Sequence, residues 1–375
     1  MGNKYAPFLN IGTGKFIKEE LEARNWRQKD LVDILGISLK NVNKLIINKQ
    51  AITIETAKLL SKAFGQSPQY WINLDTNYRL RLQKEGVEEK DVKIRANIYK
   101  YMPVKEMIKK GWLKSLKTID DLVNEIKKFW GIPTLDFSFI DDASMNFRKS
   151  EAFTQYNKYY AYTWFKMAQR CARFYKVKKY DKDALQVLAD YLFRYTILED
   201  GVETVLKKLN ESGIKFFALS HLQKTYIDGA SFFDNSNPVI VYTARHDRID
   251  NFWFTLAHEI AHILLHLKKQ DDRFIDNLDD LNTEKEKAAN KFAEKILKAK
   301  EILRYFEPYK RYISMDRVLN CAQEFEISPT IVVGILQHHD FLSQRNLNRL
   351  KTTVLELIPD EFCPERDIQK FRDVA

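Results

Sequence analysis

Three residues in the second half of the chain have the types and spacing of a hydrolytic metal site. His258 and His262 are four residues apart, and two such positions on an α-helix lie about 40° apart on one face, one turn along. The two imidazoles can therefore share one metal ion. Glu259 is one residue further round the helix, close enough to take a proton from a water molecule. This spacing is typical of zinc-dependent peptide hydrolysis, with the histidines as ligands and the glutamate as general base.

The helix that carries these residues is predicted to be buried. Apart from these three residues, nearly all positions between 252 and 265 are apolar. This is typical of a helix enclosed on all sides. Buried imidazole and carboxylate groups need polar partners, and a bound metal ion would supply one. The bare pattern His-Glu-x-x-His also occurs by chance, so the surrounding sequence has to support it.

A third protein ligand is expected on a later helix. Small and apolar residues recur at helical spacing between 286 and 297, which predicts an amphipathic helix. Glu286 and Asn290 share one face of it. Glu286 can act as the third ligand, and Asn290 can hydrogen-bond a ligand histidine. Glu284 is the alternative ligand, and the fourth position on Zn²⁺ is left for water.

Two stretches of the chain carry a family resemblance. The first is Phe254-Thr-Leu-Ala-His-Glu-Ile-Ala-His-Ile-Leu-Leu-His266, and the second is Glu286-x-x-Ala-Asn-x-Phe-Ala293. Together they resemble the ImmA/IrrE metallopeptidases of bacteria and their mobile elements, over about residues 201–335. The resemblance implies that His258, His262 and Glu286 bind Zn²⁺ and that Glu259 is the general base. The chain departs from the family at Ala261, where glycine is frequent, and in lacking a proline after the second stretch.

A helix-turn-helix is predicted near the N-terminus. Residues 28–35 and 39–46 have helical apolar spacing, Gly36 lies in the turn between them, and Ser38 is a good N-cap. The second helix fits the major groove, where asparagine reads adenine and lysine reaches guanine or phosphate, while the start of the first helix can contact phosphates. The residues predicted to contact DNA are Gln28, Lys29, Lys40, Asn41, Asn43 and Lys44. The alternative is a helical bundle with solvated lysines.

The same region carries a second resemblance. The segments Trp26-Arg-Gln-Lys-Asp-Leu31, Ile52-Thr-Ile-Glu-Thr-Ala-Lys-Leu-Leu60 and Phe64-Gly-Gln-Ser-Pro-Gln-Tyr-Trp-Ile-Asn-Leu74 are similar to the Xre-family domain of HigA-type antitoxins. This resemblance covers about residues 12–80. It implies a homodimer on a palindromic double-stranded DNA operator.

Length and composition predict a multidomain protein of the cytoplasm. The chain has 375 residues, 45% of them hydrophobic, and a net charge of +10, which is compatible with an acidic partner such as DNA. No apolar run reaches the ~18 residues of a membrane span, and the three cysteines are scattered without a metal-binding pair. Three segments are expected: residues 1–80 (helix-turn-helix), 81–200 (helical connection) and 201–375 (metallopeptidase).

The predicted fold class is α+β, mainly α. Residues 1–80 should be all-α, and the C-terminal segment should be gluzincin-like, with a small antiparallel sheet before the metal helix. The sheet strands are expected at 214–219, 228–233 and 239–242, and Gly229 would allow close approach of a peptide. Aromatic residues between 156 and 175 are interleaved with basic ones. This pattern is interpreted as core, with single-stranded nucleic-acid stacking as the alternative.

Some polar residues have no assigned role in the sequence. His266 is expected at the helix end or near a ligand. A proton donor that stabilises the oxyanion is expected among residues that the sequence does not separate: His221, His246, His338, His339 and Tyr242.

Three functions fit these motifs. The first is a DNA-binding regulator whose own zinc endopeptidase cleaves a repressor, an antitoxin or itself. The second is an antitoxin-like repressor whose metal domain senses or binds a partner, such as a toxin, without proteolysis. The third is a metallopeptidase whose N-terminal domain binds a protein substrate. The general base at Glu259 favours the first over the second, since a binding module does not need it.

Overall fold

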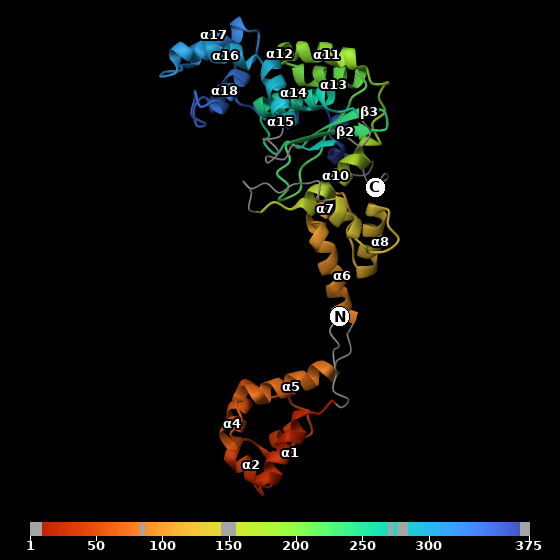
Figure 1. Cartoon of the computed structure of the whole chain (residues 1–375), viewed down its shortest axis with the longest axis vertical. Coiled ribbons are helices and arrows are strands. Elements are labelled where there is room, and N and C mark those ends of the chain that lie inside the picture. The colour runs from red at the N-terminus through yellow and green to blue at the C-terminus, as the bar shows by residue number, and fades with distance from the viewer. Residues whose placement is uncertain (1–9, 83–86, 144–154, 269–272, 276–283, 368–375) are drawn as a thin grey trace. The chain divides into compact units, whose positions relative to one another are not determined.

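The computed structural model describes residues 10–82, 87–143, 155–268, 273–275 and 284–367 (Figure 1). The chain forms two compact units, residues 1–94 and 95–375. The predicted class, mainly helical α+β with a small sheet in the C-terminal part, is confirmed. The division of the chain at residues 80 and 200 stays a prediction. Among the described residues, no helix combines the length and apolarity that crossing a membrane requires.

The first unit is a helix-turn-helix enclosed by further helices. Its helices are α1 (Thr13–Ala23), α2 (Gln28–Leu35), α3 (Leu39–Ile46), α4 (Ile54–Phe64) and α5 (Pro68–Leu82). Gly36 ends α2 with φ of 66°, a left-handed conformation that suits glycine. The Ser38 hydroxyl accepts a hydrogen bond from the backbone N–H of Asn41 at 3.2 Å and so starts α3. Leu31, Val42 and Trp71 are buried together in one core.

Asp75 connects several parts of this unit from a buried position on α5. One carboxylate oxygen accepts from the backbone N–H of Ile52 at 3.0 Å and from Arg79 Nε at 2.8 Å. The other lies 3.5 Å from the hydroxyl of Thr13 on α1. A buried carboxylate with these partners fixes α1 and the start of α4 against α5.

The second unit begins within α6 (Val87–Tyr101) and contains a sheet among many helices. The helices before the sheet are α7 (Val104–Lys109), α8 (Ile119–Trp130), α9 (Ser138–Ala143), α10 (Lys158–Ala172), α11 (Lys182–Asp190), α12 (Leu192–Tyr195) and α13 (Gly201–Glu211). Those after its first three strands are α14 (Ile249–Leu265), α15 (Glu284–Ile296), α16 (Ala299–Phe306), α17 (Met315–Glu324) and α18 (Pro329–His338). Five 3₁₀ turns follow α16 or α18: Glu307–Tyr309, Asn348–Leu350, Leu355–Leu357, Asp360–Phe362 and Pro364–Arg366.

The sheet is mixed, and the prediction of an antiparallel sheet is wrong for its first strand. Strands β1 (Lys215–Ala218), β2 (Gly229–Asp234), β3 (Asn237–Tyr242) and β4 (Arg273–Ile275) lie in the order β1-β3-β2-β4. The tight turn after Asp234 makes β2 and β3 an antiparallel hairpin, but β3 inserts between β1 and β2. Since the chain reverses twice between β1 and β3, these two neighbours run parallel.

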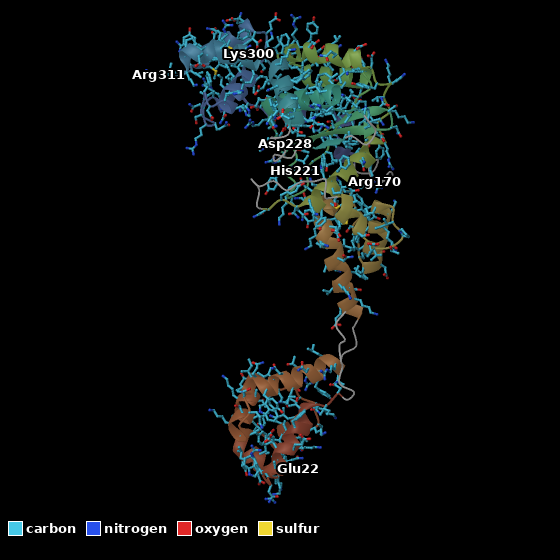
Figure 2. The ribbon with its side chains drawn as sticks, in the orientation of Figure 1. Glu22, Arg170, His221, Asp228, Lys300 and Arg311 are labelled. Carbon is cyan, nitrogen blue, oxygen red and sulfur yellow. The ribbon has the colours of Figure 1, made fainter. Side chains whose placement is uncertain are left out.

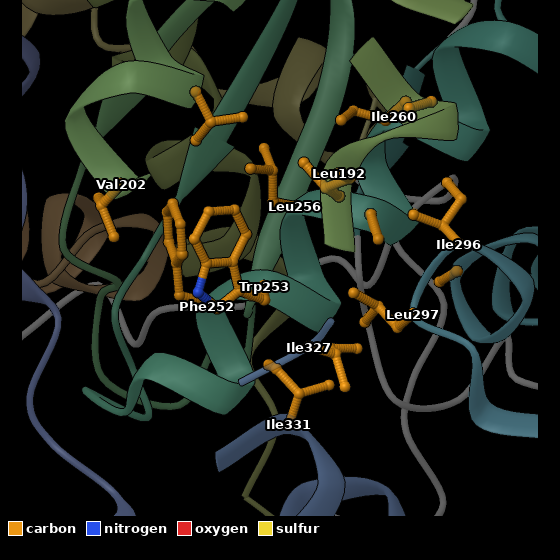
Figure 3. Close-up of a cluster of buried hydrophobic side chains, with 14 of the residues drawn as sticks. Leu192, Val202, Phe252, Trp253, Leu256, Ile260, Ile296, Leu297, Ile327 and Ile331 are labelled. Carbon is orange, nitrogen blue, oxygen red and sulfur yellow. The ribbon is translucent and has the colours of Figure 1, made fainter. Parts of the chain in front are cut away.

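Helices cover both faces of the sheet (Figure 1). On one face, Phe165 of α10 packs on Phe232 with ring centroids 5.1 Å apart, and Tyr175 stacks on Phe217 at 5.2 Å. The aromatic segment therefore contributes to the core, as interpreted from the sequence, with Trp164 and Phe165 buried and Tyr175 half-buried. The opposite face carries α14, whose apolar residues form the centre of the largest core cluster (Figure 3). The metal helix is thus enclosed between the sheet and the helices around it.

The segment after residue 350 closes the second unit against the start of α14. Lys351 Nζ lies 2.7 Å from Asp250 Oδ2, and both side chains are only 5% exposed. The backbone N–H groups of Val354 and Leu355 donate to Asp247 Oδ1 at 2.8 and 2.9 Å. Residues more than 100 positions apart in the sequence therefore hold the helix start together.

Glu365 attaches the end of this segment to Ser220, just after the first strand, and to Trp112 in the region before the sheet. Its carboxylate accepts from Trp112 Nε1 at 2.9 Å, and from the backbone N–H and hydroxyl of Ser220 at 2.8 and 2.7 Å. Charge-assisted hydrogen bonds of this kind are among the stronger polar contacts in proteins. The C-terminal segment is thus an integral part of the second unit.

Candidate metal centre

Helix α14 presents its polar residues from an apolar environment. His262 and Glu259 are fully buried, and His258 is 3% exposed. The apolar side chains of the helix, such as Leu256 and Ile260, fill the core on its other sides (Figure 3). A helix held on all sides fixes the direction of its side chains, which a metal site requires.

The donor groups of three residues, from two helices, meet at one point. His258 Nε2 lies 2.8 Å from His262 Nε2 and 3.1 Å from Glu286 Oε2, while His262 Nε2 lies 3.3 Å from Glu286 Oε1. For metal–ligand bonds of about 2.0–2.1 Å at tetrahedral angles, neighbouring donor atoms are about 3.3 Å apart. The two imidazoles and the carboxylate therefore fit one transition-metal ion, and Glu284, the alternative ligand, is not part of this group.

Further contacts orient these donors. His258 Nδ1 is 2.8 Å from Asn290 Oδ1, and an amide oxygen can only accept, so Nδ1 carries the proton and Nε2 keeps its lone pair. His266 caps the end of α14, and its Nε2 donates to the carbonyl of Lys285 at 3.0 Å. The first contact fixes a ligand ring, and the second joins the end of α14 to the residue before Glu286.

The electrostatics of Glu286 agree with a ligand role. Burial on its own would raise the pKa of this carboxyl, but its close contacts with the imidazoles of His258 and His262 outweigh burial and lower the pKa to about 2. The group is therefore an anion at every physiological pH. A charged carboxylate beside two imidazoles is a favourable donor set for a divalent cation.

Glu259 has room only because residue 229 is a glycine. A Cβ atom at Gly229 on β2 would lie 2.5 Å from Glu259 Oε1 and 2.8 Å from Thr255 Cγ2. The absence of a Cβ at Gly229 thus leaves room for the glutamate. The close approach of a peptide at Gly229, expected from the sequence, stays a prediction. Strand β2 therefore restricts the position of the carboxylate from the side opposite the helix.

A cavity of about 300 Å³ adjoins the candidate metal ligands His258 and Glu286. His258 and Glu286 contribute to its wall together with apolar side chains such as Phe254 and Ile335, and Asp228 (Figure 2) with Asp250 contributes acidic groups. A polar centre beside an apolar cavity can bind an extended segment through one side chain.

The five candidates for a proton donor that stabilises the oxyanion differ in their position relative to the cavity. Tyr242 is buried on the sheet, and its hydroxyl donates to the carbonyl of His246 at 3.2 Å. Of the five residues considered, only His338 and His339 line the cavity. His221 lies in the segment between β1 and β2 (Figure 2), where burial, with a smaller effect of Lys110, lowers its pKa to about 4.

Sequence reasoning missed two groups beside the centre. Asp250 is held by Arg248 and Lys351, and no sequence signal connects Lys351 to α14. Glu294 also lines the cavity. Glu294 follows Glu286 by eight residues, which places the two side chains about 80° apart around the helix axis and on the same side of α15. Helical spacing could therefore have identified Glu294 as a neighbour of the site.

The residues predicted to contact DNA lie on α2 and α3 of the first unit. Lys40, Asn43 and Lys44 are exposed on α3, the last two about one turn after the first, while Asn41 is half-buried beside its cap. Lys29 is exposed and Gln28 half-buried at the start of α2. The structure thus brings an exposed basic and amide surface onto the second helix of the motif.

Comparisons with known proteins agree with both parts of the chain. Residues 209–334 match the IrrE N-terminal-like domain of the Peptidase_M78 family, and residues 17–71 match a helix-turn-helix family. The first match includes the three donor residues and Glu259. The second includes α2 and α3.

Similar proteins include bacterial regulators. The chain is 34% identical over 68 residues to an uncharacterized HTH-type transcriptional regulator of Haemophilus influenzae, which is 18% of this chain and 64% of that protein, less than two thirds of its length. It is 31% identical over 75 residues to the HTH-type transcriptional regulator YddM of Escherichia coli, covering 20% of this chain and 80% of the relative. Virulence-associated protein I of Dichelobacter nodosus is 29% identical over 76 residues, 20% of this chain and 70% of that protein.

Proposed function

Because the chain belongs to the helix-turn-helix transcriptional regulators and also carries an IrrE N-terminal-like domain of the Peptidase_M78 family, we propose that it is a DNA-binding regulator and a zinc-dependent endopeptidase. Its substrate would be a repressor, an antitoxin or a second copy of the chain. The observation that carries the proposal is the arrangement of four side chains. The donor atoms of His258, His262 and Glu286 converge beside a cavity, and the buried Glu259 lies next to them.

The chemistry of the donor set favours zinc. Two imidazoles and one carboxylate are a frequent ligand set of catalytic Zn²⁺. When bound, the ion would polarise the carbonyl of a peptide as a Lewis acid. His258, His262 and Glu286 would hold it, and Asn290 would keep the His258 ring in the tautomer that presents Nε2.

The proton transfers would fall to Glu259. Its carboxylate takes a proton from the attacking water and delivers that proton to the leaving amide nitrogen, so the peptide bond breaks and the carboxylate is regenerated. Burial by α14 and β2 keeps this group away from bulk solvent and fixes its direction. The apolar part of the cavity would receive a side chain next to the scissile bond.

The DNA-binding part of the proposal rests on α3. Its exposed Lys40, Asn43 and Lys44 would enter the major groove, with Asn41 reading a base at the helix start, and Gln28 and Lys29 of α2 would contact phosphates. A homodimer on a palindromic operator would place two such helices in successive grooves. Footprinting of Lys40→Ala and Asn41→Ala tests this. Protection should be lost, while Lys62→Ala, an exposed lysine of α4, should keep it.

The decisive experiment compares the wild-type chain with Glu259→Gln, which keeps size and removes the base. Metal content is measured by elemental analysis, and each protein is mixed with bacterial lysate and with full-length Glu259→Gln chain, after which new N-termini are identified. One zinc per chain in both proteins, with cleavage only by wild type, supports the proposal. Cleavage by the variant at the wild-type rate contradicts it.

The same experiment separates the alternative. One zinc per chain without cleavage by either protein favours an antitoxin-like regulator whose metal domain binds or senses a partner. Absence of any bound metal in wild type argues against both readings of the second unit.

A further inference from the structure

A second group of metal-binding side chains lies on the wall of the same cavity. Glu294 of α15 and His338 and His339 at the end of α18 place one carboxylate oxygen and two imidazole nitrogens within 4.8 Å of one another. Glu294 Oε1 is 3.3 Å from His339 Nε2, and the two imidazole rings have centroids 5.0 Å apart at 87°. All three residues line the cavity.

The end of α18 makes this arrangement possible. Consecutive residues inside a helix point about 100° apart and do not face the same partner. The helix ends at His338, and His339 has φ −97° and ψ 18°, outside the helical geometry. Both rings can therefore face Glu294. The C-terminal end of a helix also carries a partial negative charge, which stabilises a cation nearby.

We propose that Glu294, His338 and His339 bind a second divalent transition-metal ion, separately from the first centre. Two imidazoles with one carboxylate suit Zn²⁺, Co²⁺ or Ni²⁺ and do not suit Mg²⁺, which prefers oxygen ligands. Water would complete the coordination, because His338 is exposed and the side chains of Glu294 and His339 are about one third exposed.

The spacing along α15 shows that the second ion would not act in a two-metal reaction centre. Glu294 follows Glu286 by eight residues, about 12 Å along the helix axis. Co-catalytic metal ions lie only about 3.5–4 Å apart. Phe254 separates the groups, with its ring centroid 6.4 Å from that of His258 and 6.2 Å from that of His338. The second ion would instead cross-link α15 to α18 and fix two walls of the cavity.

A purely structural role is the competing explanation, because Glu294 and His339 already form an ion pair when the imidazole is protonated. The two explanations differ in metal stoichiometry. A structural pair predicts one binding site per chain, and the proposal predicts two.

Full-length proteins dialysed to equilibrium against buffered Zn²⁺ distinguish the two explanations by elemental analysis. Wild type should bind two ions, and His339→Ala and Glu294→Gln should each bind one. His258→Ala should lose the other ion, and the matched control His246→Ala, which removes an exposed histidine outside both groups, should bind two. Circular dichroism checks that each variant is folded.

A second measurement uses Co²⁺, whose visible absorption reports its ligands. Titration of wild type should give two spectral steps. The step with the lower Co²⁺ affinity should be absent in His339→Ala and in Glu294→Gln. A single ion in wild type that His339→Ala and Glu294→Gln both retain overturns the proposal. So does retention of two ions by both variants.

Discussion

Replacing Gly229 by alanine should reduce peptide cleavage by about 100-fold without removing the metal. The added Cβ would lie 2.5 Å from Glu259 Oε1 and 3.3 Å from its Cδ, whereas favourable contacts are about 3.5–4.0 Å. The carboxylate must therefore move by about 1 Å. A displacement of this size at a catalytic group costs about 10²-fold in rate, which equals roughly 2.7 kcal/mol in the barrier.

The metal donors should not share this displacement. His258, His262 and Glu286 come from α14 and α15, and none of them is among the atoms nearest to the added Cβ. Zinc content by elemental analysis should therefore equal that of wild type, while the rate of formation of new N-termini falls. This split between metal binding and rate distinguishes a misplaced base from general unfolding.

Ser231→Ala is the matched control for Gly229→Ala. Ser231 lies two residues along the same strand and on the same face, and its buried Oγ has no hydrogen-bond partner among the described residues. Removing it should leave the rate unchanged and not lower stability. A Gly229→Ala protein that cleaves at the wild-type rate would refute the contact argument. Loss of zinc in that variant would show that the strand supports the ligands instead.

Three further predictions concern other parts of the chain. Asn290→Ala should weaken zinc binding about 10- to 100-fold in a competition assay with a chelator, because the His258 ring loses its partner. The pKa of His221 is about 4 in the folded chain, below its ordinary value, so folding stability present above pH 6.5 is lost as the pH falls towards 4. In denaturant titrations His221→Gln should lose roughly 1–2 kcal/mol less stability than wild type over this pH range, a value below the full shift because solvent screens the side chain. Asp75→Ala should lower the unfolding free energy of the first unit by about 2–3 kcal/mol in the same assay, since Arg79 loses its buried partner, and equal stability would contradict that role.

Local sequence patterns predicted the parts of the fold that depend on local spacing. The cap at Ser38 and the left-handed Gly36 follow from residue type alone, because each satisfies a conformational need within four residues. The pairing of His258 with His262 follows from helical geometry in the same way.

The features that the sequence did not predict depend on contacts between distant segments. The parallel pairing of β1 with β3 follows from the insertion of β3 between β1 and β2, a contact between segments about 20 residues apart. The role of Gly229 depends on which helix residue faces β2. The ion pair of Lys351 with Asp250 joins positions 101 apart, and nothing in the composition near Lys351 indicates it.

The contribution of residues 351–366 to the second unit has a consequence for the order of events during synthesis. The first unit ends at residue 94 and can fold as soon as it leaves the ribosome. The segment that contributes Lys351 and Glu365 to the second unit is made about 270 residues later, roughly 15–55 s at about 5–20 residues per second. If the proposed function holds, a nascent chain can occupy DNA before the contacts of Lys351 and Glu365 with the rest of the second unit have formed.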